Sequence, residues 1–387
     1  MNSSLKNVFT IILLLSFGLA AKAQTDSLNI VTSAVPFLRI SPDARAGGMG
    51  DVGIATTPDA NANFWNLAKI PYIKSPYGFS ATYTPWLKDL GLNDVYLASM
   101  SGYYKLDEES SIAGAMRYFS LGNIQFTDAN GADLNQFRPH EFGIDFGYAR
   151  KLSPNFSIGV GARFISSSLA NGATGTGGVI YKTGTAIAGD ISLYKSPSSE
   201  DGAGLSWGLV LSNLGSKIGY TNDALNKDYI PANMGVGVGY TYFFDESNKI
   251  TYALDVNKLL VPAPPVRTGD ETIDAAALTD YRSKSIIKSW FSSFGGSGGF
   301  GNELRKLQVS AGAEYVYNDQ FAIRAGYFYE DRTQGNRKYF TAGVGLKYST
   351  IGINFSYLVP SGNGVTRNPL SNTLRFGLTF DFDDVAK

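Results

Sequence analysis

The clearest pattern along this chain of 387 residues is a strict alternation of apolar and polar side chains. Near the C-terminus, Leu374, Phe376 and Leu378 fall on one face of an extended segment, whereas Arg375 and Gly377 fall on the other. A period of two over such a length is typical of a β-strand. The same alternation predicts fourteen strands, at 78–84, 94–104, 111–121, 141–150, 156–166, 184–194, 205–213, 234–244, 250–257, 307–317, 321–330, 339–348, 351–360 and 373–383.

The connections between the predicted strands alternate in length. One set is short, as in "KLSPN" and "NDQ", with "KSPSSEDGAG" as its one longer member. Short periplasmic turns and long outer loops are typical of an outer-membrane barrel with an even number of strands. The sequence therefore predicts an all-β fold, a transmembrane barrel of about 14 antiparallel strands over residues 77–387, with both termini periplasmic. The other set is long and includes 122–140, 167–183, 214–233 and 258–306.

The alternative is a soluble β-protein with one polar face. The face opposite the charged one is almost wholly aliphatic and aromatic, so it needs either lipid or an equally large partner sheet. Tyrosines such as Tyr103, Tyr104, Tyr240 and Tyr242 gather near segment ends, as in the aromatic girdles of membrane barrels. These features favour outer-membrane lipid as the surroundings. The charged face carries Arg117, Asp145, Arg163, Asp190, Glu314, Arg324, Lys347 and Arg375.

Residues 1–23 have the three parts of a secretory signal peptide. Lys6 gives a positive start, residues 8–20 are apolar, and residues 21–23 read Ala-Lys-Ala, a cleavage motif. The apolar run is shorter than the ~20 residues of a membrane-spanning helix, so the chain is predicted to be exported. The formal net charge is +0, which gives no electrostatic support to a nucleic-acid partner.

The stretch "GGMGDVG" (47–53) contains a G-x-G-x-x-G spacing, which in another setting binds a dinucleotide. That function requires a strand before the glycines and a helix after them. "RISPDARA" precedes them and "IATTPDANA", with Pro58, follows, so neither element is predicted. Residues 24–76 are instead interpreted as a plug in the barrel lumen, where glycines allow tight folding and close backbone approach.

The plug interpretation provides candidate luminal residues. Arg39, Asp43 and Arg45 cluster in a segment expected to face a wet lumen, and we hypothesise that they pair with charges on the barrel wall. A short helix is predicted over "ANANFWNLAKI", with Asp59 as its N-cap. The candidate plug residues are Arg39, Asp43, Arg45, Gly47, Gly48, Gly50, Gly53, Trp65 and Asn66.

The segment "PFLRISPDARAGGMGDVGIATTPDANANFWNLAK" (36–69) resembles the plug region of the PorV proteins. These are outer-membrane components of the type IX secretion system, within the FadL-like group of fourteen-stranded barrels. "YTPWL" (83–87) and "EFGIDFGYARKLS" (141–153) resemble the same family, and the similarity runs from about residue 30 to the C-terminus. One departure is Leu67, where the family pattern reads Trp-Asn-Pro-Ala, and it affects the local turn after Asn66.

The resemblance implies a non-enzymatic role in protein secretion. Such proteins lie beside a giant outer-membrane translocon barrel and accept secreted cargo through its C-terminal signal domain. They pass the cargo to a surface attachment complex that contains a sortase-like peptidase. The FadL-like group implies the alternative function, transport of fatty acids or other hydrophobic small molecules across the outer membrane.

The longest predicted loop, 258–306, is the candidate partner-binding element. "TIDAAALTDYRSKSIIKSWFSSF" is predicted to form a helix that ends at "GGSGG". Ile287, Trp290, Phe291 and Phe294 then form one apolar stripe with the spacing i, i+3, i+4 and i+7. Aromatic side chains are enriched in interface cores, so the stripe is a candidate partner anchor. The alternative is that the stripe packs on the protein's own loops as a lid.

No catalytic centre, cofactor site or metal site is predicted. The single histidine, His140, lies in "FRPHEF" at the edge of a predicted outer loop, whereas a catalytic base needs partners that orient it. With one histidine and no cysteine, a His or Cys metal site is excluded by count.

Overall fold

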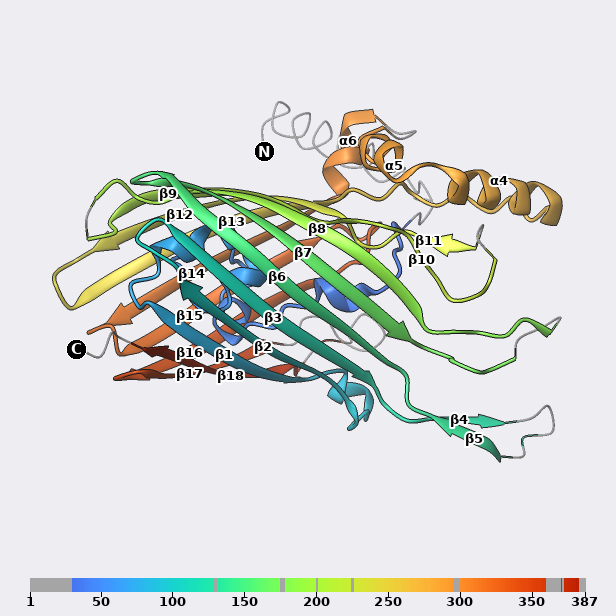
Figure 1. Ribbon diagram of the computed structural model, residues 1–387, viewed down its shortest axis with the longest axis horizontal. Helices are drawn as coiled ribbons and strands as arrows, with labels where there is room; N and C mark the ends of the chain where they lie inside the picture. The colour runs from blue at the N-terminus through green and yellow to red at the C-terminus, as the bar shows by residue number, and fades with distance from the viewer. Residues whose placement is uncertain are drawn as a thin grey trace, which may run out of the picture.

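The computed structural model describes residues 30–127, 131, 133–174, 178–199, 201–223, 226–295, 299–359, 370 and 372–382. These residues form a closed barrel of fourteen antiparallel strands (Figure 1), so the predicted number and order of strands are confirmed. The strands are β1 (Tyr77–Pro85), β2 (Val95–Lys105), β3 (Ser110–Leu121), β6 (His140–Ser153), β7 (Phe156–Ser168), β8 (Gly184–Lys195), β9 (Gly204–Gly215), β12 (Asn233–Phe243), β13 (Asn248–Leu259), β14 (Leu307–Tyr317), β15 (Phe321–Glu330), β16 (Lys338–Tyr348), β17 (Ile351–Val359) and β18 (Leu374–Phe382).

The barrel closes where the first strand pairs with the last. β1 runs antiparallel to β18, with Phe79 opposite Phe380, and its other edge pairs with β2. The Phe79 and Phe380 rings stack with their centroids 4.4 Å apart, across the seam. Closure removes the unpaired edges that an open sheet would present.

The two faces of the barrel wall differ as the alternation predicts. On the outside, Phe146 and Ile187 are 61% and 67% exposed, and they belong to an apolar band that suits lipid contact. On the inside of β12, Gly235, Gly237 and Gly239 are buried. Because these inward positions carry no side chains, another segment of chain can lie directly against the wall there.

The two ends of the barrel differ in their connections (Figure 1). Short turns join the strands at one end, where β1 begins and β18 ends. Long connections join them at the other end, which we call the outer end because long loops face outward in such barrels. The outer end carries two small hairpins, β4 (Ile124–Thr127) with β5 (Asp133–Phe137) and β10 (Ile218–Gly219) with β11 (Lys227–Asp228).

The first described residues lie at the outer end. The Ala34 amide donates to the Tyr229 carbonyl over 2.9 Å, and Val31 packs in a cluster with Tyr229 and Val261. Phe382 ends β18 at the opposite end. From residue 30 the chain passes through the barrel interior before β1 begins. Both chain ends, predicted to be periplasmic, lie outside the described residues. The predicted signal peptide, 1–23, lies outside the described residues.

In its described residues, the longest connection forms three helices rather than the one predicted. The first break falls at Lys284 and Ser285, because the Lys217 ammonium donates to the Lys284 carbonyl over 2.7 Å and the Ser285 hydroxyl accepts from the Lys288 amide. These bonds end one helix and cap the next. The helices are α4 (Glu271–Ser283), α5 (Ile286–Ser292) and α6 (Gly299–Arg305).

Between residue 30 and β1, the helical elements that the structure describes are short turns. The helix predicted over "ANANFWNLAKI" divides at Asn66, whose backbone is extended and whose side chain caps the second turn through the Ala68 amide. Among the helices that the structure describes, none has the length and apolar character needed to cross a membrane. The turns are η1 (Pro36–Arg39), α2 (Ala44–Gly47), α3 (Ala62–Trp65) and η2 (Leu67–Tyr72), and η3 (Lys88–Leu90) follows β1.

Candidate functional site

Residues 30–76, here called the N-terminal segment, run through the interior of the barrel (Figure 1). Phe37, Met49 and Val52 are at most 1% exposed, although all three precede the first strand. Met49 lies against the inward face of the wall, where an added Cβ at Gly312 would come 2.3 Å from its carbonyl oxygen. The inward glycines therefore serve the packing of this segment.

The closest approach lies at Gly50 and Gly326. Gly50 has a φ of +74°, which strains other residues, and a Cβ there would lie 2.6 Å from the Tyr327 nitrogen. From the wall side, a Cβ at Gly326 would lie 2.0 Å from the Met49 carbonyl carbon. The N-terminal segment and β15 each need glycine at this contact, because their backbones touch.

Arg45, on α2, lies at the centre of a buried ion-pair cluster. Its guanidinium contacts Glu314 of β14 over 2.6 Å and Asp59 of the N-terminal segment over 2.8 Å. Arg324 of β15 contacts the second Glu314 oxygen over 2.6 Å. Removing one member of such a cluster leaves a buried charge without its partner, which costs several kcal/mol. The cluster therefore ties the N-terminal segment to the wall.

Asp51 makes a second connection to the wall. In this connection the N-terminal segment supplies the carboxylate and the wall supplies the arginine. Its carboxylate accepts from Arg375 of β18 over 2.7 Å and from the Tyr339 hydroxyl of β16 over 2.8 Å. In the reverse direction, the wall residue Asp255 accepts from the amides of Gly53 and Ile54 over 2.8 and 2.9 Å. Ion pairs and backbone bonds together hold residues 51–54 against three strands.

Bonds within the N-terminal segment hold its own shape. The Lys69 ammonium donates to the Gly53 carbonyl over 2.7 Å, and Asp43 accepts from Trp65 Nε1 over 3.1 Å. Burial raises the pKa of Asp43 to about 6, with Asp59 adding to the shift. Burial lowers the pKa of Lys69 to about 8. Burial disfavours the charged form of both side chains, and their hydrogen bonds offset part of that cost. Such bonds suit a segment that keeps one conformation.

The structure places the candidate plug residues in different settings. Arg45 reaches a carboxylate of the wall, Arg39 donates to wall residue Gln308, and Asp43 bonds only inside the segment. Trp65 covers Gly53, where a Cβ would lie 2.1 Å from its ring. The Asn66 amide donates to the carbonyls of Ile54 and Leu193 over 3.0 Å each, so it bridges segment and wall.

The sequence hypothesis missed two anchors of this segment, Asp51 and Lys69. Asp51 stood inside the glycine motif, which drew attention to its neighbours, and Lys69 stood at the end of a predicted helix. The wall partner of Asp51 is predictable, because the alternation places Arg375 on the charged inward face. Pairing the charges of the segment with those of the wall was the available signal.

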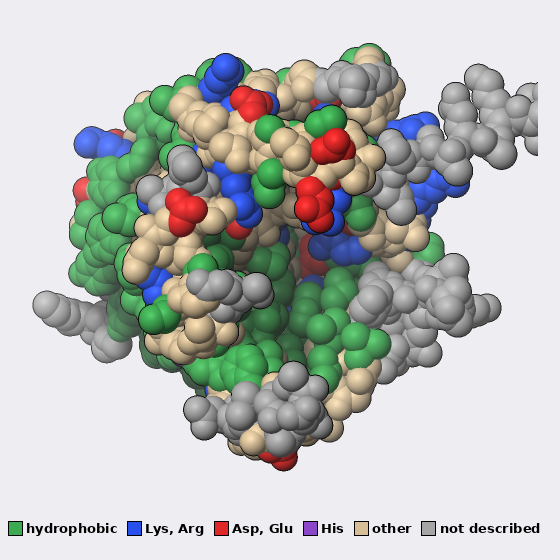
Figure 2. Space-filling model, turned by 90° about the vertical axis from the view of Figure 1, so that its right-hand side faces the viewer, with side chains coloured by type: hydrophobic (Ala, Val, Ile, Leu, Met, Phe, Trp, Pro, Cys, Tyr) green, Lys and Arg blue, Asp and Glu red, His purple; other side chains and the backbone are tan. Residues whose placement is uncertain are grey.

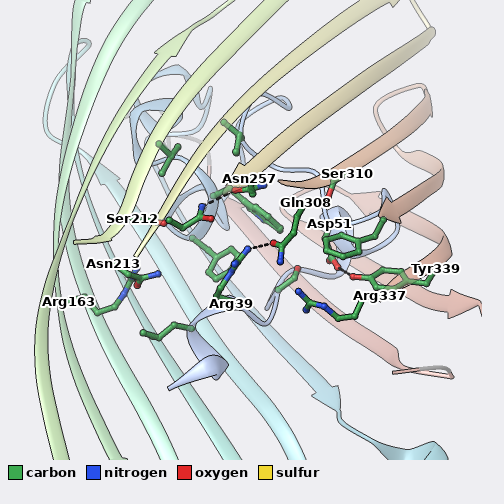
Figure 3. Close-up of a pocket in the computed structure, with 18 residues that line it drawn as sticks. Arg39, Asp51, Arg163, Ser212, Asn213, Asn257, Gln308, Ser310, Arg337 and Tyr339 are labelled. Carbon is green, nitrogen blue, oxygen red and sulfur yellow. Dashed lines mark hydrogen bonds between the residues drawn. The ribbon is translucent and has the colours of Figure 1, made fainter. Parts of the chain in front are cut away.

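The lumen retains a small polar cavity of about 100 Å³ (Figure 3). Arg39, Asp51, Arg163, Asn257 and Tyr339 are among the side chains drawn around it, and they come from the N-terminal segment and from strands on several sides. Charged and amide groups of this kind hold water rather than an apolar ligand.

Among the residues that the structure describes, no group of three or more His, Cys, Asp or Glu side chains could hold a metal ion. His140 begins β6 and stacks on Tyr118 with ring centroids 5.9 Å apart. Its Nδ1 lies 3.1 Å from the Arg138 carbonyl oxygen. The arrangement orients the ring at the rim of the wall.

The stripe predicted on the longest loop is exposed at the outer end. Ile287 and Phe291 of α5 are 63% and 74% exposed, Phe294 is exposed too, and Trp290 is half-buried. The helix turns its serine face toward the protein, and Ser289 is fully buried. α6 adds Phe300 and Leu304, both exposed. We call Ile287, Phe291, Phe294, Phe300 and Leu304 the outer apolar patch.

Comparisons with known proteins bear on this arrangement. A family model described as "Type IX secretion system protein PorV" matches residues 22–266. No curated protein matches the chain.

Among solved structures, the Ralstonia pickettii toluene transporter TbuX aligns with a TM-score of 0.51 and 13% identity, over 92% of this chain and 99% of that one. The P. putida toluene transporter TodX aligns with a TM-score of 0.50 and 11% identity, over 87% and 98%. A Pseudomonas aeruginosa FadL homologue aligns with a TM-score of 0.45 and 11% identity, over 91% and 99%. At these identities the first two alignments show a shared barrel fold alone.

Proposed function

This chain belongs to the PorV family of type IX secretion system proteins, and from that premise we propose that it receives secreted cargo at the outer end of its barrel. It is an outer-membrane component of that system. In the proposal it lies beside the giant translocon barrel, binds the cargo's C-terminal signal domain, and passes the cargo to the attachment complex with its sortase-like peptidase. The chain itself contributes binding and no catalytic step.

The filled lumen is the observation that carries this proposal. Buried ion pairs from Arg45 and Asp51 hold the N-terminal segment against the wall, and the polar cavity beside it measures about 100 Å³. A folded cargo cannot pass through such a space. The binding surfaces are then those of the outer end, and we propose that the N-terminal segment acts as a fixed plug.

The outer apolar patch supports the same proposal. Exposed apolar side chains that gather at one place are typical of interaction sites, and aromatic residues contribute strongly to interface cores. The patch stands on α5 and α6, two helices of the longest outer connection (Figure 1). We propose that it contacts either the cargo signal domain or the translocon barrel.

Phe291→Ser is expected to reduce secretion and surface attachment of cargo by about tenfold or more, because a central aromatic anchor contributes at least ~2 kcal/mol to binding. Trp290→Ala is expected to act in the same direction. The measurement is the amount of cargo on the cell surface, by immunoblot of intact cells and culture medium.

Val266→Ser is the matched control, since Val266 is 61% exposed in the same loop but outside the patch. Heat-modifiable migration of each variant shows whether the barrel folds. Normal secretion by Phe291→Ser would remove the patch from the proposed function.

The second candidate function is transport of hydrophobic small molecules. TbuX and TodX are described as toluene transporters, and this chain has an apolar hollow of about 770 Å³ outside β1 and β18, beside Tyr83, Met100 and Phe376. That hollow opens on the lipid-facing side, whereas the lumen cavity is polar. Cells with and without this protein are compared for uptake of labelled toluene or palmitate. Uptake that is lost without the protein would support transport, whereas equal uptake by the two kinds of cell would support the shuttle.

A further inference from the structure

A separate pocket opens at the outer end, between the N-terminal segment and the start of β14. Its volume is about 320 Å³, at the lower end of the ~300–1,000 Å³ of ligand sites. Figure 2 views this end of the barrel and shows basic and acidic side chains inside the central hollow, above apolar ones. The pocket lining combines apolar Val31, Pro36 and Leu259 with charged Arg39, Lys306, Glu330 and Arg337.

The pocket has more positive than negative charge, three cations against one carboxylate. Glu330 is already engaged, since it accepts from the Arg337 guanidinium over 2.8 and 2.9 Å. Lys306 is engaged as well, because it contacts Glu303 over 2.5 Å. The remaining cation is Arg39, and within the described part of the chain no carboxylate lies at ion-pair distance from it.

Arg39 is held in place by a neutral partner. Its guanidinium donates to the Gln308 side-chain oxygen, while the Gln308 amide nitrogen donates to Glu330. Burial and the nearby Arg337 lower the pKa of Arg39 to about 10, and Glu330 opposes this shift in part. Glu330 is paired with Arg337, so the site positions the Arg39 guanidinium with only a shared and partial counter-charge.

Arg39 also lies where a ligand from outside would meet it. Arg39, Gln308 and Arg337 line both the outer pocket and the inner polar cavity, so they form the boundary between the two. In Figure 3, Arg39 reaches from the N-terminal segment toward Gln308, and Arg337 lies near Tyr339. A group that enters the outer pocket and stops at this boundary faces Arg39.

We propose that the outer pocket binds a carboxylate carried on a short apolar stem, and that its ligand is the C-terminal carboxylate of the cargo's signal domain. The identity of the ligand rests on the proposed function. A guanidinium binds a carboxylate through two parallel hydrogen bonds, and capture of a free C-terminus is a recurring mode of peptide recognition. The apolar wall formed by Val31, Pro36 and Leu259 receives the last side chains of the peptide.

A fatty acid presents the same chemistry, a carboxylate on an apolar stem, so the test must separate the two sources. The purified full chain in lipid nanodiscs is titrated with a cargo signal domain labelled for fluorescence anisotropy. Competitors are a synthetic peptide with the C-terminal sequence of that domain as the free acid, the same peptide as its C-terminal amide, and palmitate.

The free-acid peptide is expected to compete about tenfold better than the amide, because the amide removes the charge-assisted pair with Arg39. Arg39→Gln is expected to abolish that difference by weakening the free acid alone, whereas Arg39→Lys restores part of it. Arg150→Gln is the control, since Arg150 is an exposed arginine at the opposite end of the barrel.

Each of the other outcomes contradicts one part of the proposal. Equal competition by the two peptides would overturn the carboxylate site and leave cargo binding intact. Displacement by palmitate alone, dependent on Arg39, would show a site for a small amphiphile and overturn the peptide assignment. Absence of any binding by the signal domain would overturn the proposed function, and the peptide assignment with it.

Discussion

Glu314→Gln is expected to lower the free energy of unfolding by about 3–5 kcal/mol, the cost of leaving a buried charge without its partner. Glu314 contacts both Arg45 and Arg324 over 2.6 Å, and its side chain is 4% exposed. After the change Arg45 keeps Asp59, whereas Arg324 keeps only the neutral Asn354. The measurement is urea unfolding in lipid vesicles, followed by tryptophan fluorescence.

A second measurement separates release of the N-terminal segment from unfolding of the barrel. The chain has no cysteine, so Ala55→Cys provides a single thiol at a position that is 1% exposed. A water-soluble maleimide should label it slowly in the parent and faster with Glu314→Gln. Arg150→Gln, which breaks an exposed pair with Glu109, is the control and should change stability by less than about 1 kcal/mol. A Glu314→Gln protein that matches this control would contradict the anchoring role of the cluster.

Gly326→Ala is expected to lower the free energy of unfolding by about 1–3 kcal/mol or more, through overpacking. The added Cβ would lie 2.0 Å from the Met49 carbonyl carbon and 2.1 Å from the Gly50 nitrogen. Backbone atoms cannot rotate away as a side chain can. The same urea unfolding measures the effect, and the Ala55→Cys thiol reports displacement of the segment.

Gly161→Ala is the matched control for this change. Gly161 also belongs to a barrel strand, but the atoms nearest to its added Cβ lie 3.6 Å or more away. It should leave both stability and labelling close to those of the parent. Equal effects of the two substitutions would indicate a general loss of glycine flexibility, and would contradict a specific contact with Met49.

Both experiments examine whether the N-terminal segment stays fixed against the barrel wall. A shuttle that binds cargo at its outer end needs a closed lumen and firm loops, and it needs no route through the barrel. A transporter of small molecules needs a segment that yields. Slow labelling of the Ala55→Cys thiol during cargo binding would therefore favour the shuttle.

Much of the fold could be predicted because strand signals are local. Alternation along residues 234–242 identifies a strand and its two faces without knowledge of any partner, since successive side chains point to opposite sides. The lengths of the connections then indicate the closure and orientation of the barrel. The inward position of Arg375 follows from the same alternation, and it proved to be a partner of the N-terminal segment.

The break in the predicted loop helix shows where local patterns are insufficient. The apolar spacing of Ile287 and Phe291 was recognised, but α4 and α5 separate at Lys284 because Lys217, far away in sequence, donates to its carbonyl. The position of residue 30 at the outer end depends in the same way on Tyr229. Such long-range contacts produce no periodic pattern in the sequence.

The sequence by itself determined the number of strands, the lipid-facing and inward faces, and the family to which the chain belongs. Only the tertiary structure decided that Arg45 meets Glu314, that Met49 lies on Gly326, and that Arg39 has a neutral partner at the mouth of the outer pocket. The physical reason is distance along the chain. Alternation is imposed by the backbone within a few residues, whereas these pairs join residues about 270 positions apart, and only closure of the barrel brings them together.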